Sequence, residues 1–211
     1  MIEVKDLFKK FGKNEVLKGI DLTIERGGIF SVLGPNGSGK TTLIKCILGM
    51  VLPDSGQISI DGKPLKNNFK YRNEIDYLPQ IANFPGNLKV NELIAMIKDL
   101  RDSKATKDEE LIELFKLQPF LNKKLANLSG GTKQKVNLVL TFMFDSPLII
   151  LDEPTSGLDP ISHLRLKNLI FSEREKGKTI LVTSHILSFV EEIADEIVFL
   201  LEGKIYFKGT I

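Results

Sequence analysis

The residues with the clearest potential for chemistry form a glycine-rich segment that begins at residue 34 and reads GPNGSGKT. It fits the phosphate-binding pattern G-x-x-x-x-G-K-[ST], in which turned backbone N–H groups surround a polyphosphate. We expect its glycines to adopt left-handed backbone angles and so to bring the chain close to the phosphates. Lys40 would supply a positive charge for the β- and γ-phosphates, and the Thr41 hydroxyl would be a ligand for Mg²⁺. The segment predicts a nucleoside triphosphate site made of Gly34, Pro35, Asn36, Gly37, Ser38, Gly39, Lys40, Thr41 and Thr42.

Two acidic residues, Asp152 and Glu153, follow an apolar run at 148–151 that is typical of a strand buried on both faces. Carboxylates at the C-terminal end of such a strand are well placed to serve a phosphate site. Asp152 would hold Mg²⁺ through water, and Glu153 would polarise the water that attacks the γ-phosphate. An ordinary surface Asp-Glu pair is the alternative, and the phosphate-binding segment upstream argues against it.

A second anion-binding end is predicted at residues 128–131, which read LSGG. Ser129 is a good N-cap for the helix that follows, and Gly130 and Gly131 leave the first N–H groups of that helix uncovered. The alternative is a flexible helix cap. One triphosphate has one γ-phosphate, so a chain with two such ends calls for an explanation.

The elements that position these residues belong to a chain of 211 residues, 42% of them hydrophobic, which is enough to bury a proper core. The 29 basic and 27 acidic residues leave a net charge of +2, and this balance gives no field that would hold nucleic acid or an anionic membrane. The single cysteine, Cys46, is expected to be a buried small hydrophobe and is compatible with a reducing, cytosolic compartment. We expect no signal peptide, because residues 1–6 contain no apolar h-region. We expect no membrane helix, because no apolar run approaches about 20 residues.

The hydrophobic pattern predicts strands that alternate with helices, and therefore a mostly parallel sheet covered on both faces. Residues 2–24 instead predict two antiparallel strands joined by the turn 11–14. Further strands are expected at 29–33, 57–60, 75–78, 148–151, 179–183, 197–201 and 204–207. Helices are expected after the phosphate-binding segment as far as Gly49, over 90–100, from a capping box at 106–109, after Ser129, after Asp159 and over 186–194. The fold class is thus α/β, in one domain, with a helical subdomain at 82–145 inserted into a core made of 1–81 and 146–211.

Taken together, these motifs resemble the ATP-binding cassette (ABC) ATPase family over nearly the whole chain. Residues 129–131 resemble the family signature, although Thr132 stands where the family usually has glutamine. Gln80 matches the Q-loop glutamine, 156–159 resemble the D-loop, and His185 matches the switch histidine. Phe11 matches the aromatic residue that stacks on adenine, where packing is the alternative role from spacing alone. His163 has no motif around it and is expected to be structural.

The resemblance implies a P-loop NTPase (RecA-like) core and a head-to-tail dimer that encloses two ATP molecules. Each phosphate-binding segment would face the signature of the other subunit, Ser129, Gly130 and Gly131, and Asp159 would join the nucleotide site. The catalytic residues implied are Glu153, His185 and Gln80, and the Mg²⁺ ligands implied are Thr41, Gln80 and Asp152. Gln80 would sense Mg²⁺ and the attacking water, and His185 would contact the γ-phosphate.

The resemblance also implies an ATPase that drives a membrane transporter from the cytoplasmic, inner face of the membrane, as a homodimer or with a paralogous cassette, docked on an integral membrane permease. Residues 76–80 and 84–88 look like the ABC-2-type exporter branch, and like the accessory ATPases of copper-site assembly in nitrous oxide reductase. We expect Phe84, Pro85 and Leu88 to form an apolar rim for the permease. A soluble ABC ATPase acting on DNA or ribosomes and a small-molecule kinase are the alternatives. The transported substrate does not follow from the sequence.

Overall fold

The computed structural model describes residues 2–65, 68–101 and 106–210 of the chain. A six-stranded sheet forms its centre, in the order β10-β9-β3-β8-β7-β6. All neighbours in this sheet are parallel except β10, which runs antiparallel to β9. Its strands are β3 (Gly28–Leu33), β6 (Ile75–Leu78), β7 (Leu148–Asp152), β8 (Thr179–Ser184), β9 (Glu196–Leu201) and β10 (Lys204–Thr210).

A second sheet is antiparallel throughout and has the order β2-β1-β4-β5. Its strands are β1 (Ile2–Phe11), β2 (Asn14–Ile24), β4 (Ser55–Ile60) and β5 (Lys63–Pro64). The pairing of Phe11 with Asn14 closes the hairpin between β1 and β2, which confirms the predicted turn. The two sheets together confirm the predicted α/β class with an antiparallel N-terminal part.

The alternation of side chains along the central strands divides the core into two clusters. In β7, Leu148 and Ile150 belong to the cluster shared with the antiparallel sheet and the helix that follows the phosphate-binding segment, α1 (Lys40–Ile47). Ile149 and Leu151 belong to the cluster under the other helices. Successive residues of a strand point to opposite faces, so a strand that is apolar throughout is covered on both sides. This explains why β7 and β8 read as continuous apolar runs.

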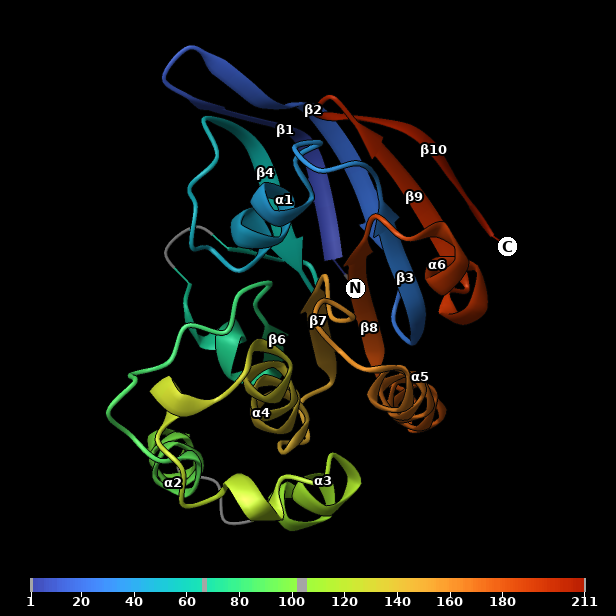
Figure 1. Cartoon of the computed structure of the whole chain (residues 1–211). Coiled ribbons are helices and arrows are strands. Elements are labelled where there is room, and N and C mark those ends of the chain that lie inside the picture. Colours follow the sequence, from blue (N-terminus) through green and yellow to red (C-terminus); the bar gives the residue numbers. More distant parts are fainter. Residues whose placement is uncertain (1, 66–67, 102–105, 211) are drawn as a thin grey trace.

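The helices are α1 (Lys40–Ile47), α2 (Val90–Leu100), α3 (Asp108–Leu114), α4 (Gly130–Phe142), α5 (Pro160–Glu175) and α6 (Leu187–Ile193), with short 3₁₀ turns η1 (Lys70–Glu74), η2 (Gln118–Phe120) and η3 (Leu125–Asn127). Figure 1 shows α2, α3 and α4 gathered at one end of the molecule, away from the antiparallel sheet. None of the helices in the described ranges is long and apolar enough to cross a membrane. Whether 82–145 is a subdomain in its own right stays a prediction.

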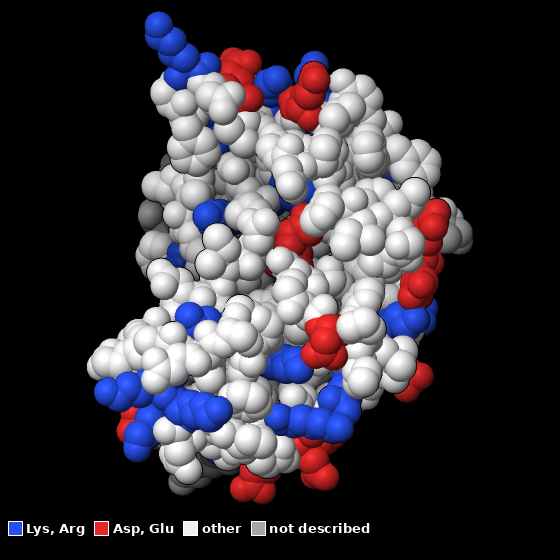
Figure 2. All heavy atoms as spheres, in the orientation of Figure 1, with Lys and Arg blue, Asp and Glu red and all other residues white. Residues whose placement is uncertain are grey.

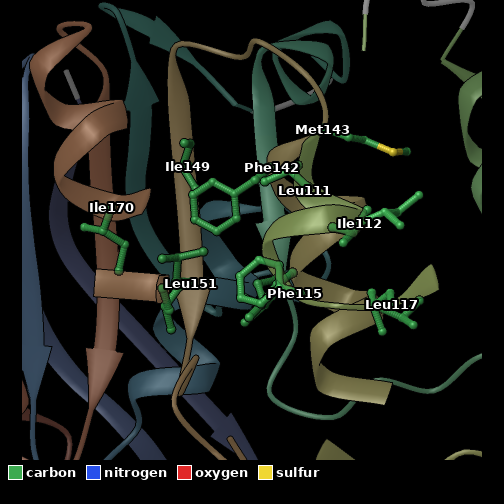
Figure 3. Close-up of a cluster of buried hydrophobic side chains, with 14 of the residues drawn as sticks. Leu111, Ile112, Phe115, Leu117, Phe142, Met143, Ile149, Leu151 and Ile170 are labelled. Atoms are coloured by element: carbon green, nitrogen blue, oxygen red, sulfur yellow. The ribbon is translucent and has the colours of Figure 1, made fainter. Parts of the chain in front are cut away.

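The helical end shares one apolar core with the central sheet. Phe115 of the α3 end and Phe142 of α4 lie beside Ile149 and Leu151 of β7 (Figure 3), and all four side chains are at most 1% exposed. This continuous packing fixes α4 against the strands that carry the acidic pair. Cys46 lies in the other cluster, where burial raises the pKa of its thiol to about 11, as expected of an unreactive cysteine.

One expectation about a helix start differs from the structure. The capping box predicted at 106–109 is absent, because α3 begins at Asp108 and its N-cap residue Lys107 makes no side-chain cap bond within the described residues. The Thr106 hydroxyl instead bonds the Asp108 carboxylate. In α2, by contrast, the Glu92 carboxylate accepts a bond from the N–H of Lys89 at 2.8 Å, although Lys89 is not a typical capping residue.

Candidate active site

The phosphate-binding segment joins the end of β3 to the start of α1, as predicted. Gly37 and Gly39 have left-handed backbone angles, with φ of 81° and 108°. The same prediction for Gly34 is wrong, because Gly34 is not among the described residues with positive φ. Gly34 is needed for space: a Cβ there would lie 2.1 Å from the carbonyl oxygen of Leu200. The loop is therefore packed against β9, and its shape does not depend on α1 alone.

Lys40, the first residue of α1, is held by its own loop. Its ammonium donates to the carbonyl oxygens of Gly34 at 2.8 Å and Pro35 at 3.2 Å. It also lies 3.2 Å from Oε1 of Glu153, and both side chains are about 95% buried, with 5% and 4% exposed. The sheet brings these two groups together because β3 and β7 both lie beside β8 and run parallel to it.

Asp152, at the end of β7, is fully buried, with 0% of its surface exposed. Its Oδ1 accepts a hydrogen bond from Thr41 Oγ1 at 3.2 Å and a shorter one from Thr183 Oγ1. Its Oδ2 has no hydrogen-bond partner within the described part of the chain. A buried carboxylate oxygen without a partner is costly, and a cation or an ordered water would satisfy it. With the Thr41 hydroxyl beside it, this set of hard oxygen atoms fits Mg²⁺.

Glu153 adopts a left-handed conformation, with φ of 50°, which is unfavourable for a residue with a side chain. Its N–H donates to the carbonyl oxygen and the hydroxyl of Thr183 at 3.2 and 3.1 Å. Its Oε2 lies 2.7 Å from Nδ1 of His185. The carboxylate thus lies between Lys40 and His185, at a strained position of the kind that is common at functional sites.

A pocket of about 330 Å³ lies over these groups and brings Gln80 and Glu153 to the phosphate-binding segment. It is lined by Asn14, Val16, Asn36, Gly37, Gly39, Lys40, Thr41, Thr42, Gln80 and Glu153. Of the predicted nucleotide-binding residues in the loop, Gly34, Pro35 and Ser38 are outside this lining. The carbonyls of Gly34 and Pro35 hold Lys40, and the Ser38 carbonyl accepts a bond from the N–H of Gly203 at 3.1 Å.

Three residues around the pocket were missed by the sequence reasoning. Asn14 and Val16 of β2 line it, because this strand passes directly over the loop. The approach is so close that a Cβ at Gly39 would lie 3.0 Å from the Val16 carbonyl oxygen. Thr183 binds both Asp152 and the backbone of Glu153. Thr183 could have been predicted from its place near the C-terminal end of a buried parallel strand, because ligands bind at that end of such sheets.

Phe11, the predicted base-stacking residue, ends β1 in the same turn as Asn14. Its side chain is 52% exposed, and the ammonium of Lys9 lies 5.3 Å from the centre of its ring. It is not part of the pocket lining. The structure leaves the ring accessible at the edge of the site, and its stacking role stays a prediction.

The predicted signature, Ser129 to Gly131, is not among the residues that line the pocket. Ser129 caps α4 and accepts a bond from the Thr132 N–H at 3.3 Å. A Cβ on Gly130 would meet no described atom within 4 Å, whereas one on Gly131 would lie 2.6 Å from the Gly157 carbonyl oxygen. The start of α4 is thus open on one side and packed against the 156–159 loop on the other.

Asp159 also lies outside the pocket lining. It caps α5 by accepting a bond from the Ser162 N–H at 2.8 Å, and it pairs with Lys135 of α4 at 2.7 Å. Hydrogen bonds from Lys135 and Ser162 hold the pKa of Asp159 well below its usual range. Its role in nucleotide binding stays a prediction.

The predicted apolar rim is different in the structure. Phe84 and Leu88 are partly buried and pack against the main core, because the loop after Gln80 folds back onto the helical end. Pro85, the third residue of the predicted rim, is exposed, and so is Ile81 of the same loop, with 76% exposed. His163 contacts the Phe189 ring with centroids 5.1 Å apart, which fits the structural role expected of it.

Comparison with known proteins agrees with this site. Residues 17–156 match the family model described as ABC transporter. The bacitracin transport ATP-binding protein BcrA of Bacillus licheniformis is 35% identical over 208 residues, which cover 97% of this chain and 68% of that protein. A solved ATP-binding subunit of an ABC transporter superposes with a TM-score of 0.91 at 34% identity, and covers 100% of this chain and 90% of that one.

A dimeric structure of the ATP-binding cassette MJ0796, in a post-hydrolysis state bound to ADP and phosphate, superposes with a TM-score of 0.88 at 25% identity. The match covers 100% of this chain and 98% of that one. The span matched by the family model, 17–156, contains the phosphate-binding loop, the start of α4 and the acidic pair, which build the pocket and its surroundings. The chain therefore belongs to the ABC transporter family, as one of its ATP-binding subunits.

Proposed function

We propose that this chain binds and hydrolyses ATP and so powers a membrane transporter, with ATP joining two cassettes and hydrolysis letting them separate. The observation that carries the proposal is the pocket in which the phosphate-binding loop, Gln80 and Glu153 meet above the buried Asp152. Backbone N–H groups of the loop and the Lys40 ammonium bind the phosphates. Thr41, Gln80 and Asp152 would hold Mg²⁺, which neutralises phosphate charge when it is bound.

Glu153 is the general base of the proposed reaction. It takes a proton from the water whose oxygen attacks the γ-phosphorus, while the bond from that phosphorus to the bridging oxygen breaks and yields ADP and phosphate. His185 supports this role because its Nδ1 lies 2.7 Å from the Glu153 carboxylate and holds it in place. The backbone of Glu153 is fixed by Thr183, so the base has little freedom to turn away.

A second subunit is needed to complete the site. The signature at Ser129–Gly131 does not line the pocket of its own chain, yet it offers a capped helix start with an open face at Gly130. Exposed apolar side chains flank Asp159 and His185 in the sequence: Ile161, Leu164, Ile186 and Leu187. Figure 2 shows a broad uncharged area at the upper right of the face in view, beside the acidic and basic side chains near its middle. These features support a partner cassette whose signature closes over ATP.

Transport further requires a permease, and we place the chain on the inner face of the membrane through such a partner. Two exposed apolar residues of the loop after Gln80, Ile81 and Pro85, are available for docking there. Membership of the ABC-2-type exporter branch, including the copper-site assembly ATPases, stays a prediction from residues 76–80 and 84–88.

The binding step is tested with Lys40→Ala. The substitution should abolish ATP binding measured by calorimetry, because the phosphates lose the cation that Gly34 and Pro35 hold beside them. The matched control is Lys45→Ala, on the same helix but outside the pocket lining, which should bind ATP normally. Near-normal affinity in Lys40→Ala would refute the assignment of the site.

A further inference from the structure

Helix α4 carries a line of three buried polar side chains. Gln134, Asn137 and Thr141 are exposed by only 5%, 3% and 3%. Their spacing of three and four residues puts them on one face of the helix. A buried amide needs a hydrogen-bond partner, so the acceptors of these side chains show what α4 is attached to.

The two amides bind the chain next to the two candidate catalytic residues. Gln134 Nε2 donates to the carbonyl oxygen of Pro154 at 3.1 Å, and Pro154 directly follows Glu153. Asn137 Nδ2 donates to the carbonyl oxygen of Pro79 at 3.1 Å, and Pro79 directly precedes Gln80. One helix thus holds both catalytic loops through two side chains.

Both prolines lie just beyond the end of the central sheet. The pairing of β6 with β7 ends at Leu78 and Leu151, and that of β7 with β8 ends at Asp152 and Thr183. Proline has no N–H to donate, so its carbonyl is the main-chain group by which each of these residues can be held. Where the sheet stops fixing the backbone, the α4 amides continue to do so.

The same helix begins at the signature. A helix rises 1.5 Å per residue, which puts Asn137 about 12 Å along the axis from Ser129. We infer that Gln134 and Asn137 are positioning residues for hydrolysis, which hold Glu153 and Gln80 at a fixed position relative to the signature end of α4. The inference rests on the proposed ATPase function and concerns two residues that do not line the nucleotide pocket.

Thr141 provides a matched control on the same face. Its hydroxyl bonds the carbonyl oxygens of Asn137 at 2.9 Å and Tyr77 at 3.4 Å. Tyr77 lies inside β6 and is already paired with Ile150 of β7. Thr141→Val therefore removes a buried bond from the same helix without releasing either catalytic loop.

The test compares kcat and KM for ATP in Gln134→Met, Asn137→Leu and Thr141→Val. The first two variants keep most of the volume but lose the donor, and we expect kcat to fall at least tenfold with KM within twofold, because small misplacements of catalytic groups are costly. Thr141→Val should keep kcat within twofold even if its melting temperature falls as much as the melting temperatures of the two amide variants. If the two amide variants lose no more kcat than Thr141→Val, the inference is overturned.

A second variant covers the case in which Asn137→Leu does not fold. In Asn137→Asp the ionised carboxylate repels the Pro79 carbonyl, whereas the protonated acid donates to it. We expect the kcat of this variant, relative to the unchanged chain, to recover as the pH is lowered. A ratio that stays flat with pH overturns the inference. Both of these results would overturn the inference alone, because the unchanged chain would still hydrolyse ATP. A lack of hydrolysis in the unchanged chain would instead refute the proposed function and the inference together.

Discussion

Replacing Glu153 by glutamine tests the chemistry at one atom. In the unchanged chain, Nδ1 of His185 lies 2.7 Å from Oε2 of Glu153. The variant keeps the shape of this side chain and an oxygen that can face His185, but it cannot accept a proton from water. Loss of a general base lowers a rate by roughly 10²–10⁴, which is about 3–5 kcal/mol of transition-state stabilisation. ATP should still bind, because the loop N–H groups and Lys40 are unchanged.

The assay is phosphate release under steady-state conditions, with ATP binding followed separately by calorimetry. Glu202→Gln is a matched control, because Glu202 also has a left-handed φ, of 48°, but lies exposed in the turn between β9 and β10. We expect the control to hydrolyse ATP at the parent rate. Hydrolysis by Glu153→Gln at the parent rate would show that Glu153 is not the base.

Two more predictions concern buried carboxylates. Asp152→Asn should weaken the Mg²⁺ dependence of hydrolysis by tenfold or more, because the oxygen without a described partner loses its charge; an unchanged Mg²⁺ titration would contradict this role. Burial raises the pKa of Glu173, but the hydrogen bond from Lys176 and the ion pair with Lys178 outweigh it and leave the pKa below its usual value. The carboxylate therefore stabilises the fold above about pH 4.3 and loses this effect as the pH falls through the lowered pKa. Glu173→Gln should cost about 3 kcal/mol at pH 7 in urea unfolding and flatten the acid side of the stability profile; an unchanged profile would contradict it.

The sequence was sufficient for features that depend on local pattern. Continuous apolar runs correctly predicted the buried strands around Ile150 and Leu181, because parallel strands covered on both faces need them. The cap at Ser129 and the start of a helix after Asp159 were predicted correctly as well, since each side chain bonds an N–H three residues later. The order of the motifs along the chain was enough to indicate the family.

Features that depend on contacts between distant elements were not predictable. Gly34 is glycine because the Leu200 carbonyl is close, and nothing near residue 34 in the sequence reports this. The partial burial of Phe84 and the bonds of Thr183 and Asn137 to catalytic segments also join residues far apart in the chain. Such contacts require the register of the whole sheet, which no single segment specifies.

The central claim is that ATP is hydrolysed between two subunits, and mixing two inactive chains tests it most directly. Lys40→Ala lacks a working phosphate site, and Ser129→Arg blocks the open helix start of the signature. A heterodimer of the two contains one site built from an intact loop and an intact signature. We predict that each variant alone is inactive and that the mixture regains hydrolysis from this single site. No recovery in proven heterodimers, or full activity in Ser129→Arg alone, would contradict closure between subunits.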